Sequence, residues 1–475
     1  MSAAFAGLAP EPFWRHFAAL TQIPRPSHKE EAAAAHVVAW AQARGLATAR
    51  DAAGNLVVRV PATPGREAAA TVILQGHLDM VCERDPDSPY DPRTGPVGVL
   101  REGDWLRADG TTLGADDGVA IAAMLAVAED GAPHGPLELL MTVAEEVGLV
   151  GARELDPALI DGTLLLNLDS EEDATLTVGC SGSVDTVVHF GAPRAPVAEP
   201  LWRVTASGGR GGHSGGDIAL ARANAIKALA RALRAAPGIR IAAFDGGASR
   251  NAIPRDATAL IAASGEARAA IEAEAARIAD ALRSTDPAVR IEVAAAAPSA
   301  TAWSTTDSER ILDLIAAIPS GPLAMSTDFP GVVETSSSLS IATTAGDTLA
   351  VQSLSRSAND AALPDVTGAI AAAARLAGAR YEQGDGYPGW RPDLSSPLLA
   401  AARATHERLF GAPPHVTLTH GGLEAAIIAA KRPGIDAISF GPQVEGPHAP
   451  GERLSIPSAR RFMRLLAALL DAVSR

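Results

Sequence analysis

Cysteine is scarce in this chain, which contains only Cys82 and Cys180 among its 475 residues. Two cysteines cannot build the disulfide framework of a small secreted protein, so we expect a reducing, cytoplasmic location. Aromatic residues are also few, at 4% of the chain. We therefore expect hydrophobic cores made mainly of alanine, leucine, valine and isoleucine.

Long apolar runs and excess positive charge are missing as well. No run reaches the roughly 18 apolar residues that a membrane helix needs. The first residues lack the basic and then apolar pattern of a secretory signal. The formal net charge of −15 disfavours nucleic acid and anionic membranes. We expect neither a nucleic-acid partner nor a membrane partner.

Helix-like and strand-like segments alternate in the N-terminal part. Residues 12–45 predict two helices, separated at Pro24 and Pro26. A helical pattern covers Asp117–Ala128. Short apolar runs typical of buried strands cover Asn55–Val60, Thr71–Gln75, Leu137–Val143 and Leu164–Leu168. This alternation predicts an α/β fold with helices around a mostly parallel sheet.

The pattern changes near Gly179–Ser183 and predicts an inserted α+β region. Its expected helices are Asp217–Ala235, Ala267–Arg283, Ser308–Ile318 and Asp360–Ala377. Its expected strands are Leu201–Ala206, Arg240–Phe244, Ala257–Ala263, Arg290–Ala294, Val332–Ile341 and Leu349–Ser355. The segment Tyr381–Pro392, rich in glycine and proline, predicts a returning linker.

After this linker the alternation of helices and strands resumes. The expected elements are helices Leu398–Leu409, Leu423–Ala430 and Ser458–Val473 and strands His415–Leu418 and Ala437–Phe440. We therefore predict a discontinuous catalytic domain, residues 1–182 and 388–475. An inserted lid domain, residues 183–387, interrupts it.

Acidic and histidine side chains stand where predicted strands end or helices begin. There are five such sites: His77 with Asp79, Asp116 with Asp117, Glu145 with Glu146, Asp169, and His448. In open α/β sheets, ligands bind beyond the carboxyl ends of the strands. We therefore expect the five sites to converge on one crevice.

The residue types at these sites fit a pair of metal ions. Zinc binds histidine nitrogen and carboxylate oxygen, and a catalytic zinc keeps one position open for water. Two ions about 3.5–4 Å apart need a carboxylate that bridges them. Without cations, so many carboxylates would raise one another's pKa and oppose folding.

Each motif alone has an ordinary structural explanation. A histidine after a strand is usually structural, an Asp-Asp-Gly sequence before a helix usually caps it, and a Glu-Glu pair usually lies on a solvated surface. We assign Glu171-Glu172 to this surface class. The metal hypothesis depends on the order and placement of all five sites together.

These motifs resemble those of the two-zinc aminoacylase/carboxypeptidase-type metallopeptidases, and among them the aminoacyl-histidine dipeptidases (Xaa-His dipeptidases, peptidase D). The matching stretches are LQGHLDMV, GTTLGADDGVAIA, TVAEEVGLVGA, LLNLDSEE, GRGGHSGGDI, SRNAIP, YPGW and FGPQVEGPHAPGE. The resemblance implies a hydrolase that cleaves unblocked dipeptides, with Xaa-His dipeptides as the family's expected substrates.

The resemblance also implies which residues hold two Zn²⁺ ions. His77 and Asp169 would bind one ion. Glu146 and His448 would bind the other, and Asp116 would bridge both. Co²⁺ or Mn²⁺ can substitute in such mixed ligand sets.

Two carboxylates beside the metals would act in catalysis. Asp79 would hold the ring of His77. Glu145 would be the general base that takes a proton from a zinc-bridged water. The family also suggests a cis peptide bond between Asp116 and Asp117.

Residues of the insertion would bind the small-peptide substrate. The resemblance implies that His213 stabilises the oxyanion, that Asn251 binds the substrate backbone and that Arg356 clamps the free carboxylate. His420 and Glu424 match a further family stretch without a defined role. The resemblance further implies a homodimer formed through the lid.

The chain departs from the family pattern at two positions. Asp117 stands where asparagine is common, which adds negative charge beside the metals. Ser338 stands where asparagine is expected, so a substrate contact can differ here and the preference for histidine-containing dipeptides is open.

Three other functions are compatible with parts of this pattern. A deacylase acting on N-acylated amino acids would use the same metal centre. A non-catalytic metal-binding protein would not need Glu145. A two-metal phosphoesterase would need a basic cluster beside the metal ligands, and the sequence offers none there.

Overall fold

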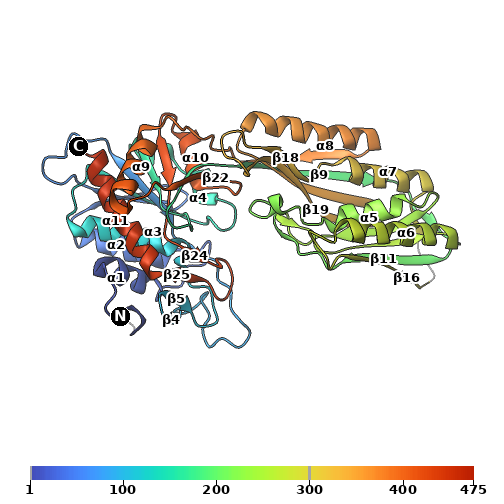
Figure 1. Cartoon of the computed structure of the whole chain (residues 1–475), viewed down its shortest axis with the longest axis horizontal. Helices are drawn as coiled ribbons and strands as arrows, with labels where there is room; N and C mark the ends of the chain where they lie inside the picture. The colour runs from blue at the N-terminus through green and yellow to red at the C-terminus, as the bar shows by residue number, and fades with distance from the viewer. Residues whose placement is uncertain (1–2, 298–300) are drawn as a thin grey trace. The chain divides into compact units, whose positions relative to one another are not determined.

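The computed structural model describes residues 3–297 and 301–475. The chain folds into two compact units, both coloured by residue number in Figure 1. The first unit contains Met1–Gly179, Pro392–Leu418 and Leu423–Arg475. The second contains Cys180–Arg391 and Thr419–Gly422. The first unit is thus assembled from both ends of the chain.

An eight-stranded sheet forms the centre of the first unit. Its order is β1 (Ala47–Arg50), β2 (Leu56–Val60), β6 (Leu137–Thr142), β3 (Val72–His77), β7 (Leu164–Asn167), β23 (Asp436–Ser439), β8 (Thr175–Cys180) and β22 (His415–Thr419). The central strands β6, β3, β7 and β23 run parallel. Every residue of β3 and β6 is buried, as the continuous apolar runs predict. The predicted α/β class is confirmed.

Helices surround this sheet. They are α1 (Glu11–Leu20), α2 (Glu31–Gln42), α3 (Ala115–Asp130), α4 (Val150–Glu154), α9 (Pro397–Phe410), α10 (Glu424–Lys431) and α11 (Ile456–Val473), with 3₁₀ turns at Ala3–Phe5 and Pro157–Leu159. Nearly all of α3 is buried, which explains why its sequence is apolar on every face. A smaller sheet orders β24 (Val444–Glu445), β25 (Arg453–Ser455), β5 (Trp105–Ala108) and β4 (Val99–Glu102).

The second unit contains a nine-stranded antiparallel sheet. Its strands are β16 (Arg290–Ala295), β11 (Leu201–Ser207), β15 (Ala257–Ala262), β13 (Arg240–Gly246), β19 (Val333–Ala345), β20 (Thr348–Ser357), β9 (Gly182–Gly191), β21 (Arg380–Gln383) and, beside β19, β18 (Gly321–Met325). Short pairs join β10 (Ala195–Pro196) to β17 (Thr301–Ala302) and β12 (Gly212–His213) to β14 (Ala252–Ile253).

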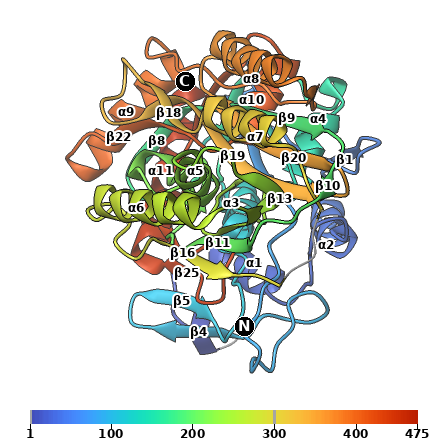
Figure 2. The same cartoon turned by 90° about the vertical axis from the view of Figure 1, so that its right-hand side faces the viewer.

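Four helices pack against this second sheet and close its core. They are α5 (Ala225–Arg234), α6 (Gly265–Ala281), α7 (Thr305–Ala317) and α8 (Leu363–Ala377), with 3₁₀ turns at Ile218–Leu220 and Asp360–Ala362. Figure 2 shows these helices in a row along one face of the sheet. Their apolar faces join residues of β11, β13, β15, β19 and β20 in one hydrophobic cluster.

The sequence prediction differs from the structure at several places in the second unit. The helix predicted to start at Asp217 starts at Ala225, because the Asn224 side chain caps it by accepting from the Lys227 N–H. The predicted linker Tyr381–Pro392 begins inside strand β21, which pairs with β9. Strand β9 itself was not predicted, since its partners β20 and β21 lie far away in the sequence.

A search of the described helices finds none that combines the length and the apolarity needed to cross a bilayer.

The second core yields a stability prediction from two leucines of contrasting burial. Leu339 of β19 is 0% exposed, whereas Leu376 of α8 is 87% exposed. We expect Leu339→Ala to lower the free energy of unfolding by about 2–5 kcal/mol, because it leaves a cavity. Leu376→Ala should change it by less than about 0.5 kcal/mol. Urea denaturation followed by circular dichroism measures both, and equal effects would contradict this packing.

Candidate metal centre

The sequence-predicted metal ligands all lie in the first unit, at one edge of its sheet. His77 ends β3, Glu145 and Glu146 follow β6, and Asp169 follows β7. Because these three strands are parallel, their carboxyl ends meet at the same edge. Asp116 comes from the start of α3, and His448 from the loop between β24 and β25.

Asp116 is shared between two groups of potential metal ligands. One group consists of His77, Asp116 and Asp169, and the other of Asp116, Glu146 and His448. Within each group the ligand atoms lie within 4.8 Å of one another. The Oδ1 atom of Asp116 lies 2.9 Å from His77 Nε2, and its Oδ2 atom lies 3.0 Å from His448 Nε2. The two oxygens of one carboxylate therefore face two different histidines.

Each group gains a second carboxylate oxygen close to its histidine. Asp169 Oδ1 lies 3.6 Å from His77 Nε2. Glu146 Oε2 lies 3.1 Å from His448 Nε2. A third possible combination brings Glu145 and Glu146 within reach of His77, so Glu145 also faces this centre.

Asp79 supports the centre from behind and is itself fully buried. Its Oδ1 atom lies 3.3 Å from the Nδ1 atom of His77. The same carboxylate accepts hydrogen bonds from the backbone N–H groups of Glu145 (3.0 Å) and Glu146 (3.2 Å), and from the Ser27 hydroxyl (2.7 Å). One side chain thus orients the His77 ring and the turn that carries both glutamates.

The peptide bond between Asp116 and Asp117 is cis, as expected from the family resemblance. The Asp117 carboxylate accepts a hydrogen bond from the His77 backbone N–H at 3.1 Å. It fills the space left by Gly76, where a Cβ atom would lie 2.3 Å from Asp117 Oδ2. Burial and the nearby charge of Asp169 raise the pKa of Asp117 well above its usual value.

The protonation of the centre reflects crowded carboxylates. Burial raises the pKa of Asp169 to about 6 and that of Glu145 well above its usual range. Burial lowers the pKa of His77, but the charge of Asp169 and the contact with Asp116 outweigh it, so this pKa is raised. Hydrogen bonds to Asp116 and Glu146 raise the pKa of His448 to about 11. Protons on both rings therefore balance part of the negative charge.

The donor set fits divalent cations. Each group offers one imidazole nitrogen and at least two carboxylate oxygens, which are ordinary ligands of zinc and related metals. The Oε1 atom of Glu146 is buried and has no hydrogen-bond partner among the described residues. A bound cation would satisfy such an atom, whereas a buried carboxylate oxygen without a partner is costly.

The interpretation of Glu171 as a solvated surface residue was wrong. Its side chain is half-buried, whereas that of Glu172 is exposed. Burial and the charges of Asp116 and Asp169 raise the pKa of Glu171 to about 8. A pair of glutamates after a strand does not show in the sequence which of the two side chains the fold will bury in part, because no apolar residue alternates with them.

Glu424 lies beneath the centre, at the start of α10. It is fully buried and accepts hydrogen bonds from Gln75 of β3 (2.6 Å) and from the Thr142 hydroxyl of β6. Gln75 in turn accepts from the side chain of Asn167 on β7 at 2.6 Å. This polar network ties together the three parallel strands that carry ligand candidates, and burial raises the pKa of Glu424 to about 7.

The substrate-binding candidates lie in the second unit. His213 is on β12, which pairs with β14, and the carbonyl oxygen of Asn251 accepts from the Ser214 N–H at 2.7 Å. Arg356 of β20 is only 4% exposed. Its guanidinium approaches His213 Nε2 at 3.5 Å and donates to the Tyr387 hydroxyl at 3.3 Å. Tyr387 belongs to the YPGW stretch and received no role from the sequence.

His420 is held between two serine side chains of the second unit. Its Nδ1 atom lies 2.8 Å from the Ser181 hydroxyl and its Nε2 atom lies 2.7 Å from the Ser336 hydroxyl. Burial, with the nearby positive charge of Arg356, lowers the pKa of His420 to about 4. The ring is therefore neutral at physiological pH.

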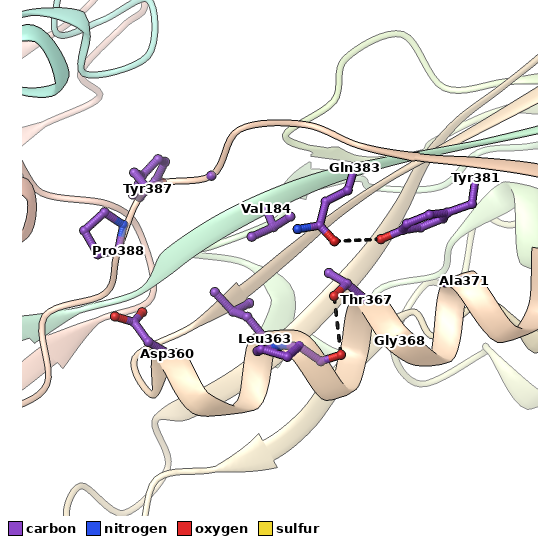
Figure 3. A pocket seen from close by; sticks show the side chains of 12 residues that line it. Val184, Asp360, Leu363, Thr367, Gly368, Ala371, Tyr381, Gln383, Tyr387 and Pro388 are labelled. Atoms are coloured by element: carbon purple, nitrogen blue, oxygen red, sulfur yellow. Dashed lines mark hydrogen bonds between the residues drawn. The ribbon is translucent and has the colours of Figure 1, made fainter.

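Two cavities of the second unit are lined mostly by other residues. The first, about 480 Å³, lies between α8 and the segment around Tyr387, and Figure 3 shows Asp360 and Gln383 at its wall. The Tyr381 hydroxyl donates to Gln383 at 2.9 Å there. The second cavity, about 390 Å³, is lined in part by Ser338. The Ser338 hydroxyl has no hydrogen-bond partner in the described part of the chain.

Known proteins resemble this chain over most of its length. Residues 73–472 match the model of peptidase family M20/M25/M40. The chain is 35% identical over 476 residues to the cytosol non-specific dipeptidase of Escherichia coli (strain K12), covering 98% of each protein.

Solved structures are similar as well. The structure of aminoacylhistidine dipeptidase from Vibrio alginolyticus matches with a TM-score of 0.87 and 35% identity, over 99% of this chain and 98% of that chain. Aminopeptidase PepT from Bacillus cereus ATCC 10987 has a TM-score of 0.58 at 18% identity, over 98% and 100% of the chains, so it shares the fold. The resemblance seen in the sequence motifs is confirmed, and the chain belongs to peptidase family M20/M25/M40.

Proposed function

We propose that this protein is a metal-dependent dipeptidase that hydrolyses the peptide bond of unblocked dipeptides. The observation that carries the proposal is the shared carboxylate of Asp116, whose two oxygens face His77 and His448. A carboxylate placed in this way can bridge two cations. The names of the two relatives that cover nearly the whole chain support the substrate class.

The cations that we propose are two Zn²⁺ ions, for which Co²⁺ or Mn²⁺ can substitute. His77 and Asp169 would hold one ion, Glu146 and His448 the other, and Asp116 both. When bound, such ions supply Lewis-acid chemistry, which polarises a carbonyl group and acidifies water. This assignment uses every ligand candidate in the two groups that share Asp116.

Glu145 is the proposed general base. Its carboxylate faces the centre but is not needed in either group that shares Asp116, so it is available for proton transfer. Its pKa is raised by burial in the metal-free protein, and nearby cations would favour the ionised form that a base requires. Glu145 takes a proton from water and delivers it to the leaving amine. Asp79 keeps the His77 ring and the Glu145 backbone in place for this step.

Three residues of the second unit are proposed to bind the substrate. Arg356 can grip a carboxylate with two parallel hydrogen bonds, because its guanidinium is a rigid fork. His213 would donate to the carbonyl oxygen as it becomes negative. Asn251 would bind the peptide backbone. A carboxylate clamp would favour dipeptides over longer peptides.

We also propose that the chain forms two domains with different roles. Residues 1–182 and 388–475 would form the catalytic domain, and residues 183–387 a lid that also mediates a homodimer. A cytoplasmic location is supported by the low cysteine content of two residues and by the name of the Escherichia coli relative.

The first prediction concerns substrates. The metal-reconstituted protein should cleave Gly-His, β-Ala-His and Leu-Gly but not an N-acetylated dipeptide, and chelation should abolish the cleavage. Amino-acid release from this panel, resolved by chromatography, also decides between a histidine preference and broad specificity. Cleavage of the acetylated compound alone would replace the proposal with a deacylase.

The second prediction concerns the base. Glu145→Gln should lower kcat by about 10²-fold or more, because the amide cannot accept the proton, while two metal ions remain bound. Glu172→Gln is a matched control, since its exposed carboxylate should be dispensable. Steady-state kinetics with metal analysis of the same samples tests this, and a wild-type kcat in Glu145→Gln would exclude Glu145 as the base.

The third prediction concerns pH. The pKa of His448, raised to about 11, means that the metal-free protein carries a proton on this ring at neutral pH. A ligating histidine must lose that proton, so metal binding should release protons, and the apparent affinity should rise about tenfold per pH unit for each proton released. Calorimetry from about pH 6 to about pH 8 measures this. An affinity that does not change with pH would exclude His448 as a ligand.

The fourth prediction concerns the carboxylate clamp. Arg356→Met should raise KM for a free dipeptide by about 10- to 100-fold, because a charged hydrogen-bonding partner is lost. The corresponding dipeptide amide has no free carboxylate for Arg356 to bind, so the variant and the wild type should have the same KM for it. Equal effects on both substrates would mean that Arg356 acts on structure and not on the carboxylate.

A further inference from the structure

Glu452 lies four residues after His448, in the loop between β24 and β25, and is 2% exposed. Its carboxylate accepts hydrogen bonds from four consecutive backbone N–H groups. Oε2 accepts from Leu113 at 2.7 Å and Gly114 at 3.0 Å. Oε1 accepts from Ala115 at 2.7 Å and Asp116 at 3.3 Å.

These N–H groups precede the regular part of α3 and would otherwise lack partners. Gly114 has a left-handed backbone (φ 70°), and Asp116 has non-helical angles (φ −80°, ψ 109°). The Gly114 carbonyl accepts from the Gly118 N–H at 3.2 Å, whereas the N–H groups of residues 113–116 donate to Glu452. The carboxylate of Glu452, which is distant in the sequence, supplies the hydrogen-bond acceptors for these N–H groups.

A buried arginine holds the same segment from the other side. Arg25 is 2% exposed, and it donates to the carbonyl oxygens of Gly114 (2.5 Å), Leu78 (3.0 Å) and Asp79 (2.7 Å). There is no room for a side chain between them, because a Cβ atom on Gly114 would lie 2.7 Å from Arg25 Nη2. The backbone beside Asp116 is thus fixed between a guanidinium and a carboxylate.

Glu452 also links two ligand candidates that come from opposite ends of the sequence. It closes the loop of His448, since its N–H donates to the Ala449 carbonyl at 3.1 Å. Its carboxylate simultaneously holds the backbone of Asp116. Of the ligand candidates, His448 is the most exposed, with 54% of its side chain accessible. Its loop therefore gains most from a side chain that fixes its position.

We propose that Glu452 is a positioning residue. It fixes the backbone of Asp116 and the loop of His448 relative to each other, and thereby forms the metal group Asp116–Glu146–His448 even without bound metal. This inference rests on the proposed metal-dependent function. The group His77–Asp116–Asp169 depends on Glu452 less, because His77 and Asp169 are fixed at the ends of β3 and β7.

The test compares the metal affinities of Glu452→Gln and the wild type. Gln keeps the size of the side chain but offers one acceptor oxygen in place of two. We expect one of two bound Co²⁺ ions to bind about 10- to 100-fold more weakly, the range typical when a side chain that supports a ligand is lost. The other ion should bind within about threefold of the wild type. Excess metal should restore kcat.

Two further variants serve as controls. Glu445→Gln makes the same chemical change on β24, where Glu445 pairs with Arg453, and should bind both ions as the wild type does. His448→Ala identifies which Co²⁺ absorption band belongs to the group that contains His448. The band lost in Glu452→Gln should be the same one.

The metal titration tests the role of Glu452 separately from the proposed function. Wild-type affinity at both sites in Glu452→Gln would overturn the inference and leave the proposed function intact. Equal weakening of both ions would mean a general structural role and would also overturn it. Failure of the wild type itself to bind metal would instead refute the proposed function.

A second measurement needs no variant and covers the case in which Glu452→Gln does not fold. Hydrogen exchange of the amides of residues 113–116 is followed in the chelated wild-type protein. Slow exchange, at least about 100-fold below that of an unstructured peptide, is expected if Glu452 holds the segment without metal. Fast exchange that slows only when metal is added would show that the metal, and not Glu452, organises the segment.

Discussion

The crowding of carboxylates at one edge of the first sheet is the constraint on which the rest of the structure depends. Asp116, Glu145, Glu146 and Asp169 converge there with two histidines. Like charges at such distances raise one another's pKa and oppose folding. Protonated His77 and His448 relieve part of this repulsion, and divalent cations would relieve more of it. The parallel strands, the Asp79 support and the Glu424 network can all be understood as means of holding these repelling groups together.

Much of this centre could be predicted from the sequence, for a physical reason. Buried parallel strands are continuous apolar runs, and a polar residue that ends such a run points into the crevice at the sheet edge. His77 ends β3, and Glu146 and Asp169 stand shortly after the ends of β6 and β7. The α/β class followed from the same runs. The helix predicted at Ser308–Ile318 exists as α7, but it begins earlier, at Thr305, after the capping residue Ser304, which the prediction missed.

What the sequence did not reveal depends on contacts between distant segments. Glu452 and the backbone of residues 113–116 are separated by more than 330 positions, so no local pattern connects them. Glu171 and Glu172 look identical in the sequence, but the fold half-buries Glu171 and leaves Glu172 exposed. Strand β9 was missed because its pairing with β20 and β21, and not its composition, makes it a strand. In each case tertiary context outweighed local preference.

The proposed metal centre depends on Asp116, whose carboxylate would bridge two metal ions. Anomalous X-ray diffraction at the zinc absorption edge, from crystals of the wild-type protein grown with Zn²⁺, tests it most directly. Two anomalous peaks about 3.5–4 Å apart are expected, one between His77 and Asp169 and one between Glu146 and His448, with the Asp116 carboxylate between them. A single peak, or peaks that do not contact Asp116, would contradict it.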